Sequence, residues 1–136
     1  MEIGSLITRA VLTVEESDSF HEAAVWMMER GIGSAVVLKD GKPAGIITDR
    51  DALRVIARGT DTSKVSVGDC VTRGLKPVTP SMELAEAARM MRDKGFRHLV
   101  VVDDNGDLYG VFSMRDLVVG LLEERTMAAA AANATS

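Results

Sequence analysis

The sequence predicts an α+β protein built from two tandem repeats, each a small β-sheet with two helices, packed with pseudo-two-fold symmetry. The first observation is a signature that occurs twice: Gly45–Asp51 reads GIITDRD, and Gly110–Asp116 reads GVFSMRD 65 positions later. The second is that most of the remaining chain also repeats. A unit of about 60 residues leaves one apolar face uncovered, so two such units in tandem can cover each other.

The repeat extends far upstream of the signatures, where residues match at a spacing of 64. The matched pairs include Thr8 and Thr72, Glu22 and Glu86, Met27 and Met91, and Gly31 and Gly95. The spacing changes by one residue at a turn, where Asp40-Gly41 becomes Asp104-Asn105-Gly106, and a turn tolerates an insertion easily. We therefore expect two domains, over residues 1–62 and 63–125, followed by an alanine-rich tail over 126–136.

Both repeats are expected to run strand, helix, strand, strand, helix, because each has one segment with apolar residues at helical spacing and then two apolar runs around an Asp/Gly turn. The expected elements of the first repeat are a strand ending the segment 7–14, a helix from Phe20, strands over 34–38 and 44–47, and a helix over 49–58. Those of the second are 71–78, a helix from Leu84, 99–102, 108–112 and 115–124. Ser19 with Glu22 fits a capping box, and Gly31 and Gly95 fit helix stops. The tail either extends the last helix or frays.

Composition indicates a soluble globular protein, because 46% of the residues are apolar and 26% are charged, without a run long enough to span a bilayer. The net charge of −4 argues against broad attraction to nucleic acid or acidic membranes. The first residues lack a secretory signal, and the single Cys70 cannot form an internal disulfide, so we expect the protein in the cytoplasm.

The two signatures place a hydroxyl three residues before a carboxylate, as Thr48 with Asp51 and Ser113 with Asp116. If each hydroxyl lies where a strand meets a helix, the carboxylate is one turn on and on the same side. A carboxylate can bind the two adjacent hydroxyls of a ribose, and the helix start favours a phosphate. The same spacing also describes a helix-capping box, and the two roles are compatible.

Basic residues near the signatures are candidates for binding phosphate. Arg50 and Arg115 recur inside the signatures, whereas Arg97 and His98 have Gly33-Ser34 at the matching place of the first repeat. The arginine fork suits phosphate oxygens. We therefore expect two unequal sites, with phosphorylated ligand bound more tightly at the second.

Catalysis and metal binding are not expected. His98 and the other histidine, His21, show no ligand spacing, and a structural or incidental role is favoured for Cys70. No nucleophile with a base and no phosphate loop of P-loop spacing occurs in the sequence.

The double signature, the apolar hairpin that begins at 95–103 and the Glu-Ala-Ala segments at 22–24 and 86–88 together resemble a tandem pair of cystathionine-β-synthase (CBS) domains, known as a Bateman module. The resemblance covers nearly the whole chain. It implies a stand-alone, non-enzymatic regulatory module that binds adenosine-containing ligands in clefts between its halves, often as a dimer. It also places the adenine against Val14, Val78 and Thr79.

Three functions follow from this resemblance. The leading one is a sensor of AMP, ADP or ATP that acts on an unknown protein partner. The alternatives are a module that binds S-adenosylmethionine or another adenosine derivative, and a ligand-free dimerisation module in which the signatures only cap helices. A homodimer is expected to form through the helices carrying Met27-Met28 and Met90-Met91, unless these methionines pack in the core, or through the signature helices.

Overall fold

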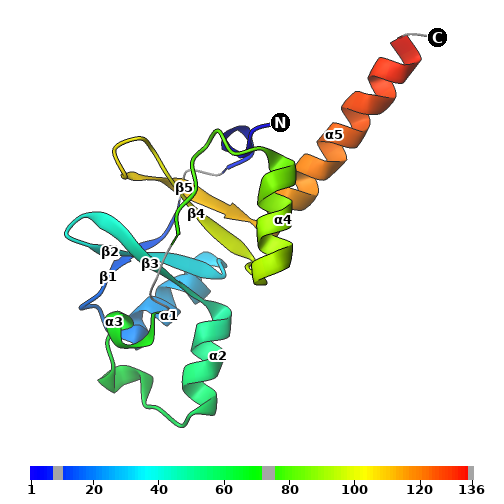
Figure 1. Ribbon diagram of the computed structural model, residues 1–136. Coiled ribbons are helices and arrows are strands. Elements are labelled where there is room, and N and C mark those ends of the chain that lie inside the picture. The colour runs from blue at the N-terminus through cyan, green and yellow to red at the C-terminus, as the bar shows by residue number, and fades with distance from the viewer. Residues whose placement is uncertain (8–10, 72–75, 135–136) are drawn as a thin grey trace. The chain divides into compact units, whose positions relative to one another are not determined.

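The computed structural model describes residues 1–7, 11–71 and 76–134. They divide between two compact units (Figure 1). The first-repeat unit comprises Ala10–Lys76 and Gly106–Leu108, and the second-repeat unit comprises Met1–Arg9, Pro77–Asn105 and Tyr109–Ser136. The domain boundaries expected from the repeat stay a prediction, but the compact units do not follow the chain in simple succession.

The first-repeat unit has the predicted order of elements. They are β1 (Thr13–Glu15), α1 (Phe20–Arg30), β2 (Ser34–Lys39), β3 (Lys42–Thr48) and α2 (Asp49–Ala57). β2 is central in the sheet, pairing in parallel with β1 and antiparallel with β3. Asp40 and Gly41 both have positive φ, as the tight turn of a two-residue hairpin requires. The chain therefore enters α2 directly from the end of β3.

The predicted helix stops are confirmed, and one half of the predicted capping box, the bond to Ser19, is present. The Ser19 side chain accepts a hydrogen bond from the Glu22 N–H at 3.4 Å, and Gly31 ends α1 with φ of 63°. Gly95 ends the corresponding helix of the second repeat with φ of 68°. A left-handed residue at this position is a common helix stop that favours glycine.

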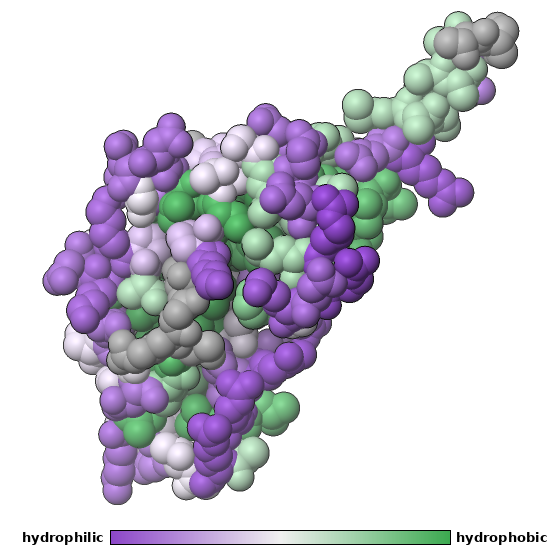
Figure 2. All heavy atoms as spheres, viewed as in Figure 1, coloured by the Kyte–Doolittle hydropathy of each residue, from purple (hydrophilic) through white to green (hydrophobic). Residues whose placement is uncertain are grey.

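The second-repeat unit contains α4 (Leu84–Lys94), β4 (His98–Val102), β5 (Leu108–Ser113) and α5 (Met114–Ala134). β4 and β5 form a two-stranded sheet. The strand expected at the end of 71–78 is reduced to one parallel bridge between Val78 and Val101; residues 72–75 lie outside the described part. The predicted last helix continues through the tail to Ala134 because alanine is the strongest helix former. Figure 2 shows this end as pale green atoms extending outward.

Two short segments are exchanged between the repeats, Ile3–Ser5 (η1) and Val67–Cys70 (α3). The Ile3 N–H donates to Met82 O at 2.9 Å, and the Val67 N–H donates to Asp18 O at 2.8 Å. Each donor and acceptor lies 64 positions from its counterpart. Each repeat thus supplies its leading segment to the unit of the other repeat. Between α2 and α3 the chain forms a short 3-10 helix, η2 (Thr62–Lys64).

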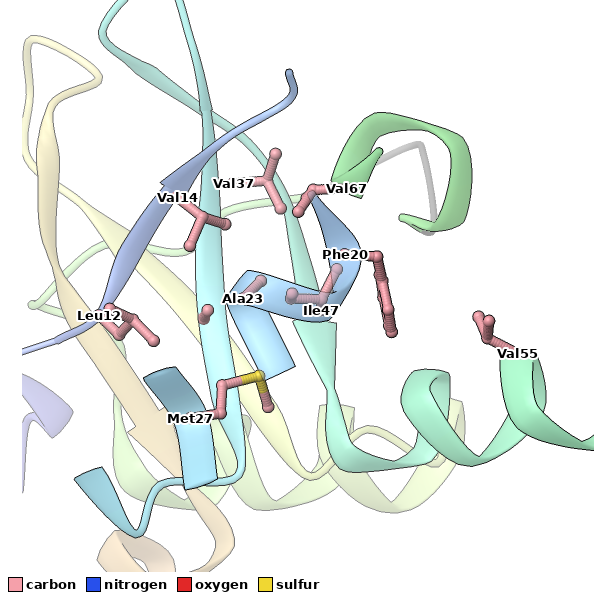
Figure 3. Close-up of a cluster of buried hydrophobic side chains, with 10 residues drawn as sticks. Leu12, Val14, Phe20, Ala23, Met27, Val37, Ile47, Val55 and Val67 are labelled. Carbon is pink, nitrogen blue, oxygen red and sulfur yellow. The ribbon is translucent and has the colours of Figure 1, made fainter. Parts of the chain in front are cut away.

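Each unit has its own apolar core. Figure 3 shows that of the first-repeat unit, where Phe20, Val37 and Val67 lie among ten buried side chains from all its sheet strands and helices α1 to α3. Ile3 takes the corresponding place in the other core, with Leu84 and Phe112 among its neighbours.

The core also decides the role of two methionines. Met27 and Met91 are buried, so the expectation that they pack in the core is confirmed, whereas the Met28 side chain is 83% exposed. In the described part of the chain, no helix combines the length and the apolar character needed to cross a bilayer.

Candidate functional site

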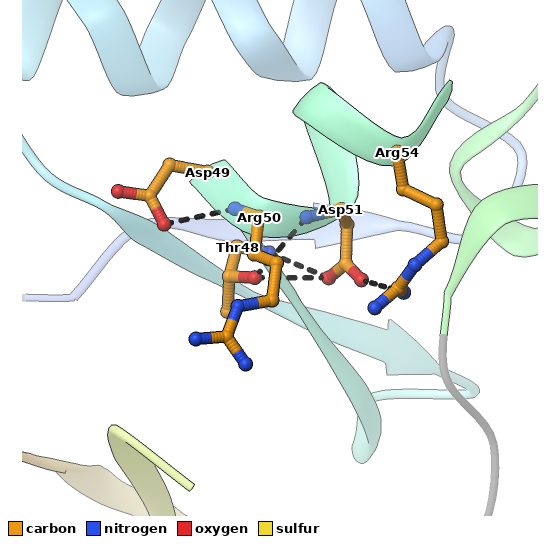
Figure 4. Close-up of polar contacts among 5 residues, drawn as sticks. All are labelled: Thr48, Asp49, Arg50, Asp51 and Arg54. Atoms are coloured by element: carbon orange, nitrogen blue, oxygen red, sulfur yellow. Dashed lines mark hydrogen bonds and ion pairs between the residues drawn. The ribbon is translucent and has the colours of Figure 1, made fainter. Parts of the chain in front are cut away.

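The first signature forms a complete capping box at the start of α2 (Figure 4). Asp51 Oδ2 accepts hydrogen bonds from the Thr48 N–H at 2.8 Å and from Thr48 Oγ1 at 3.2 Å. Thr48 Oγ1 in turn accepts from the Asp51 N–H at 3.4 Å. The short strand-to-helix step of the signature therefore brings the hydroxyl and the carboxylate together, as the three-residue spacing predicted.

The second signature repeats this arrangement at the start of α5. Asp116 Oδ2 accepts from the Ser113 N–H at 2.8 Å and from Ser113 Oγ at 3.0 Å. Ser113 Oγ accepts from the Asp116 N–H at 3.3 Å. Each carboxylate uses one oxygen, Oδ2, to hold its helix start. Because a carboxylate has two oxygens, Oδ1 is the atom that a ligand could use.

The two Oδ1 atoms differ in what surrounds them. Asp51 Oδ1 accepts a hydrogen bond from Arg54 Nη1 at 3.0 Å, which is also an ion pair along α2. The position that corresponds to Arg54 in the second repeat is Val119. No group in the described ranges donates to Asp116 Oδ1. Asp51 is 6% exposed, and Asp116 is only half-buried.

The first residue of each signature helix adds a second difference. Asp49 begins α2, and its carboxylate accepts from the Arg50 N–H at 2.9 Å. Its carboxylate also lies over Gly33, 3.4 Å from where a Cβ at that glycine would stand. The corresponding residue in α5 is Met114. An anion approaching the start of α2 therefore meets a negative charge and an occupied N–H group.

The cationic residues of the second repeat gather at the start of α5. The Met114 N–H donates to Arg97 O at 2.9 Å, which places the beginning of β4 beside this helix start. Arg97 is exposed, and half-buried His98 begins β4. Arg115 is exposed in the first turn of α5. The basic residues predicted for the second site thus lie on segments that meet at this helix start.

The residues expected beside an adenine are placed differently. Val14 on β1 and Val78 are buried in the two cores, so their side chains are not exposed to a ligand. The Val78 N–H donates to Val100 O, and Val78 O accepts from the Val102 N–H, each at 2.9 Å. Exposed Thr79 follows, with its hydroxyl 3.0 Å from that of Ser81.

Cys70 is not a reactive thiol, and the described residues do not group into a metal site. Burial, and secondarily the charges of Asp69 and Asp51, raise the pKa of the Cys70 thiol, so the thiol is protonated at neutral pH and is a poor nucleophile. Within 1–7, 11–71 and 76–134, no three or more His, Cys, Asp or Glu side chains group in a way that could hold a metal ion.

Two functional candidates, Arg54 and Asp49, were missed in the sequence. The signal for Arg54 was its position three residues after Asp51, since such residues are neighbours on a helix. Asp49 could have been noticed because it puts an acidic residue in the first turn, where the second repeat has Met114. Figure 4 shows both on α2, Asp49 next to Thr48 and Arg54 next to the Asp51 carboxylate.

The family model of the CBS domain matches this chain twice, over residues 3–58 and 67–123. An uncharacterized protein of Methanopyrus kandleri, MK0525, is 37% identical over 87% of this chain and 61% of its own length. The CBS domain-containing protein YhcV of Bacillus subtilis is 32% identical over 93% of this chain and 90% of its own. Arabinose 5-phosphate isomerase KdsD of Pseudomonas aeruginosa is 34% identical, but only 35% of its length is covered.

Solved structures agree with these matches. The CBS domain protein PAE2072 of Pyrobaculum aerophilum, complexed with AMP, has a TM-score of 0.82 and 29% identity, covering 93% of this chain and 99% of its own. CBSX2, also in complex with AMP, has a TM-score of 0.79 and 26% identity, covering 91% of this chain and 98% of its own.

Proposed function

Because this chain belongs to the CBS domain family and carries two copies of the domain in tandem, we propose that it is a regulatory module that binds adenine nucleotides at its signature helix starts. The nucleotide would be AMP, ADP or ATP, and its effect would be to change the shape or assembly of the module and so the activity of a protein partner. The chain covers only 61% of the length of MK0525. The regulation of a protein partner is therefore proposed here and is not taken from that relative.

One observation carries the proposal: the Asp116 carboxylate has an oxygen, Oδ1, to which no group of the described residues donates, beside a helix start where the segments carrying Arg97, His98 and Arg115 meet. Oδ1 can accept from a ribose hydroxyl, and the cations and helix start suit phosphate oxygens. This combination is the chemistry of a nucleotide. The AMP complexes of PAE2072 and CBSX2 support the same class of ligand.

A non-catalytic role accords with these groups. Their arrangement supplies a hydrogen-bond acceptor for a sugar and positive charge for an anion, which are means of binding. KdsD, an enzyme, resembles this chain over only about a third of its own length. The catalytic part of such an enzyme can then reside in the remaining portion.

The ligand class is tested by thermal shift with AMP, ADP, ATP, NAD and S-adenosylmethionine, because a ligand that binds only the folded protein raises its apparent stability. We expect the adenine nucleotides to raise the unfolding temperature. Calorimetric titration of each active compound then gives affinity and stoichiometry. Stabilisation by S-adenosylmethionine alone would contradict the nucleotide proposal, and no stabilisation or heat with any compound would leave the capping role of the signatures.

A further inference from the structure

We propose that Arg54 occupies the ribose acceptor of the first signature and so acts as an internal competitor that makes this the weaker nucleoside site. The inference rests on the proposed function and deepens it, because it identifies a residue that sets the affinity of one signature. It concerns the sugar and is independent of the phosphate cations that differ between the repeats.

The geometry of the carboxylate supports this role. Asp51 Oδ2 is committed to the Thr48 N–H and hydroxyl, at 2.8 and 3.2 Å. Arg54 Nη1 holds the remaining oxygen, Oδ1, at 3.0 Å. Figure 4 shows the two sets of bonds on opposite oxygens, with the guanidinium on the far side from Thr48. A ribose hydroxyl that binds Asp51 must displace this guanidinium or share its acceptor.

The pair is also placed where it can be broken. The Arg54 side chain is 46% exposed, whereas that of Asp51 is 8% exposed. The arginine can therefore swing into water, where its charge is well solvated, when a ligand takes its place. An ion pair with one exposed partner contributes little, so Arg54 lowers affinity for a ligand without closing the site.

The second repeat provides a natural comparison without the competitor. Ser113 and Asp116 make the same three capping bonds within about 0.2 Å of the first set. Val119 replaces Arg54 at the matching position, and its side chain cannot donate a hydrogen bond. The two signatures thus share the same capping bonds, and only the first has a donor to Oδ1 among the described residues.

Exchanging the two residues tests the proposal. Arg54→Val is measured with Asp116→Ala, so that calorimetry reports the first signature, and Val119→Arg is measured with Asp51→Ala to report the second. The ligands are AMP and adenosine. We expect Arg54→Val to tighten binding about two- to fivefold and Val119→Arg to weaken it by a similar factor, since an exposed ion pair of this strength must be broken.

Matched variants separate competition from general charge effects. Arg58→Val removes a cation from the far end of the same helix region, and Met127→Arg adds one farther along α5; neither should change affinity for adenosine. The affinity of Arg54→Lys for adenosine should lie between that of the protein with Arg54 and that of Arg54→Val. With uncharged adenosine, salt should improve binding at the first signature of the Arg54 protein but not of Arg54→Val, because salt screens the Arg54–Asp51 pair.

Circular dichroism of every variant establishes that it is folded. If AMP and adenosine bind but the exchange leaves both affinities unchanged, the competitor role is wrong while the proposed function stands. Weaker binding by Arg54→Val would also overturn it, since Arg54 would then contact the ligand. If the protein with both signatures intact binds neither compound, the proposed function fails and this inference fails with it.

Discussion

The two carboxylate oxygens of Asp116 have different roles. Oδ2 accepts the capping bonds from Ser113, and Oδ1 is left for a ligand. We expect Asp116→Ala to weaken binding of AMP and adenosine alike, by about 1.5–3 kcal/mol, the range for a hydrogen bond to a charged group. Calorimetry gives the affinities. Exposed Asp104 in the β4–β5 turn provides a control, and Asp104→Ala should bind normally.

The same substitution removes the cap, so its effect on folding is measured separately. Loss of an N-cap partner costs about 0.5–2 kcal/mol of stability, which urea unfolding without ligand will report. Wild-type affinity in both Asp51→Ala and Asp116→Ala, each still folded, would eliminate the ribose role and leave only capping.

The pair Arg97 and His98 is expected to recognise the phosphate. Replacing both by alanine should reduce affinity for AMP much more than for adenosine, and the affinity of the unaltered protein for AMP should fall with salt, because charges near the surface are screened over about 8–10 Å. Titration of both ligands at two salt concentrations provides the measurement.

A paired control tests whether any loss of positive charge has this effect. Arg92 and Lys94 are exposed at the end of α4. Replacing both by alanine should lower the affinity for AMP less than replacing Arg97 and His98 does. An equal loss for AMP and adenosine in the Arg97 and His98 variant would mean that these residues shape the site instead of meeting the phosphate.

The site was predictable from the sequence to the extent that it is local. The spacing of Thr48 and Asp51, repeated in the second copy, predicts which side chains meet, because three residues along a helix are about one turn. The partner of the second oxygen was not predicted. Whether Arg54 turns toward Asp51 or toward water depends on a rotamer choice that the repeat alone does not specify.

Among the elements, the exchanged segment Ile3–Ser5 lies close against the backbone of Pro80. The Gly4 N–H donates to Pro80 O at 2.9 Å. A Cβ at Gly4 would lie 2.8 Å from Pro80 Cβ and 2.9 Å from Pro80 O. Since this is backbone and a rigid ring, Gly4→Ala should destabilise the protein by about 1–3 kcal/mol, as overpacking does. Urea unfolding monitored by circular dichroism gives the difference.

Gly68 is the matched position in the other exchanged segment. A Cβ at Gly68 would lie 3.2 Å from Glu16 O and 3.3 Å from Glu16 Cβ. Gly68→Ala should therefore destabilise the protein less than Gly4→Ala. A Gly4→Ala protein as stable as wild type would show that the segment can move away from Pro80 at little cost.

The helices and hairpins were predictable because their signals are local: the glycines after α1 and α4, the Asp-Gly turn, and the apolar spacing. The exchange was not. Ile3 and Val67 are 64 positions apart, so the repeat reaches these segments, but the partners of Ile3 lie beyond position 77. Local pattern contains no information about which distant core a three-residue segment will enter.

For the molecule as a whole, the two signature helices expose apolar residues at the same places. These are Leu53 and Ile56 on α2, and Val118 and Leu121 on α5, which correspond at a spacing of 65. On α1, the exposed apolar residues Val25 and Met28 have charged counterparts in the second repeat, Arg89 and Arg92. Of the surfaces expected to form a dimer, the signature helices are therefore favoured by both repeats.

Light scattering tests this prediction. We expect a dimer mass at tens of micromolar, and Leu53→Glu with Ile56→Glu should shift it toward the monomer because buried charges oppose association. Thr60→Glu adds a charge at another exposed position of the same unit and should not. A monomer mass for the unaltered protein, with and without AMP, would contradict the prediction.

The exchange of leading segments also sets an order of events during synthesis. The core residues of the first-repeat unit all lie between Leu12 and Val67, so this unit can close while the ribosome is still adding the second repeat. Ile3, made earlier, waits for partners as late as Leu117. The entropy of closing so long a loop grows only slowly with its length, so the delay affects timing more than stability. A segment synthesised before the whole first-repeat core is then among the last to pack.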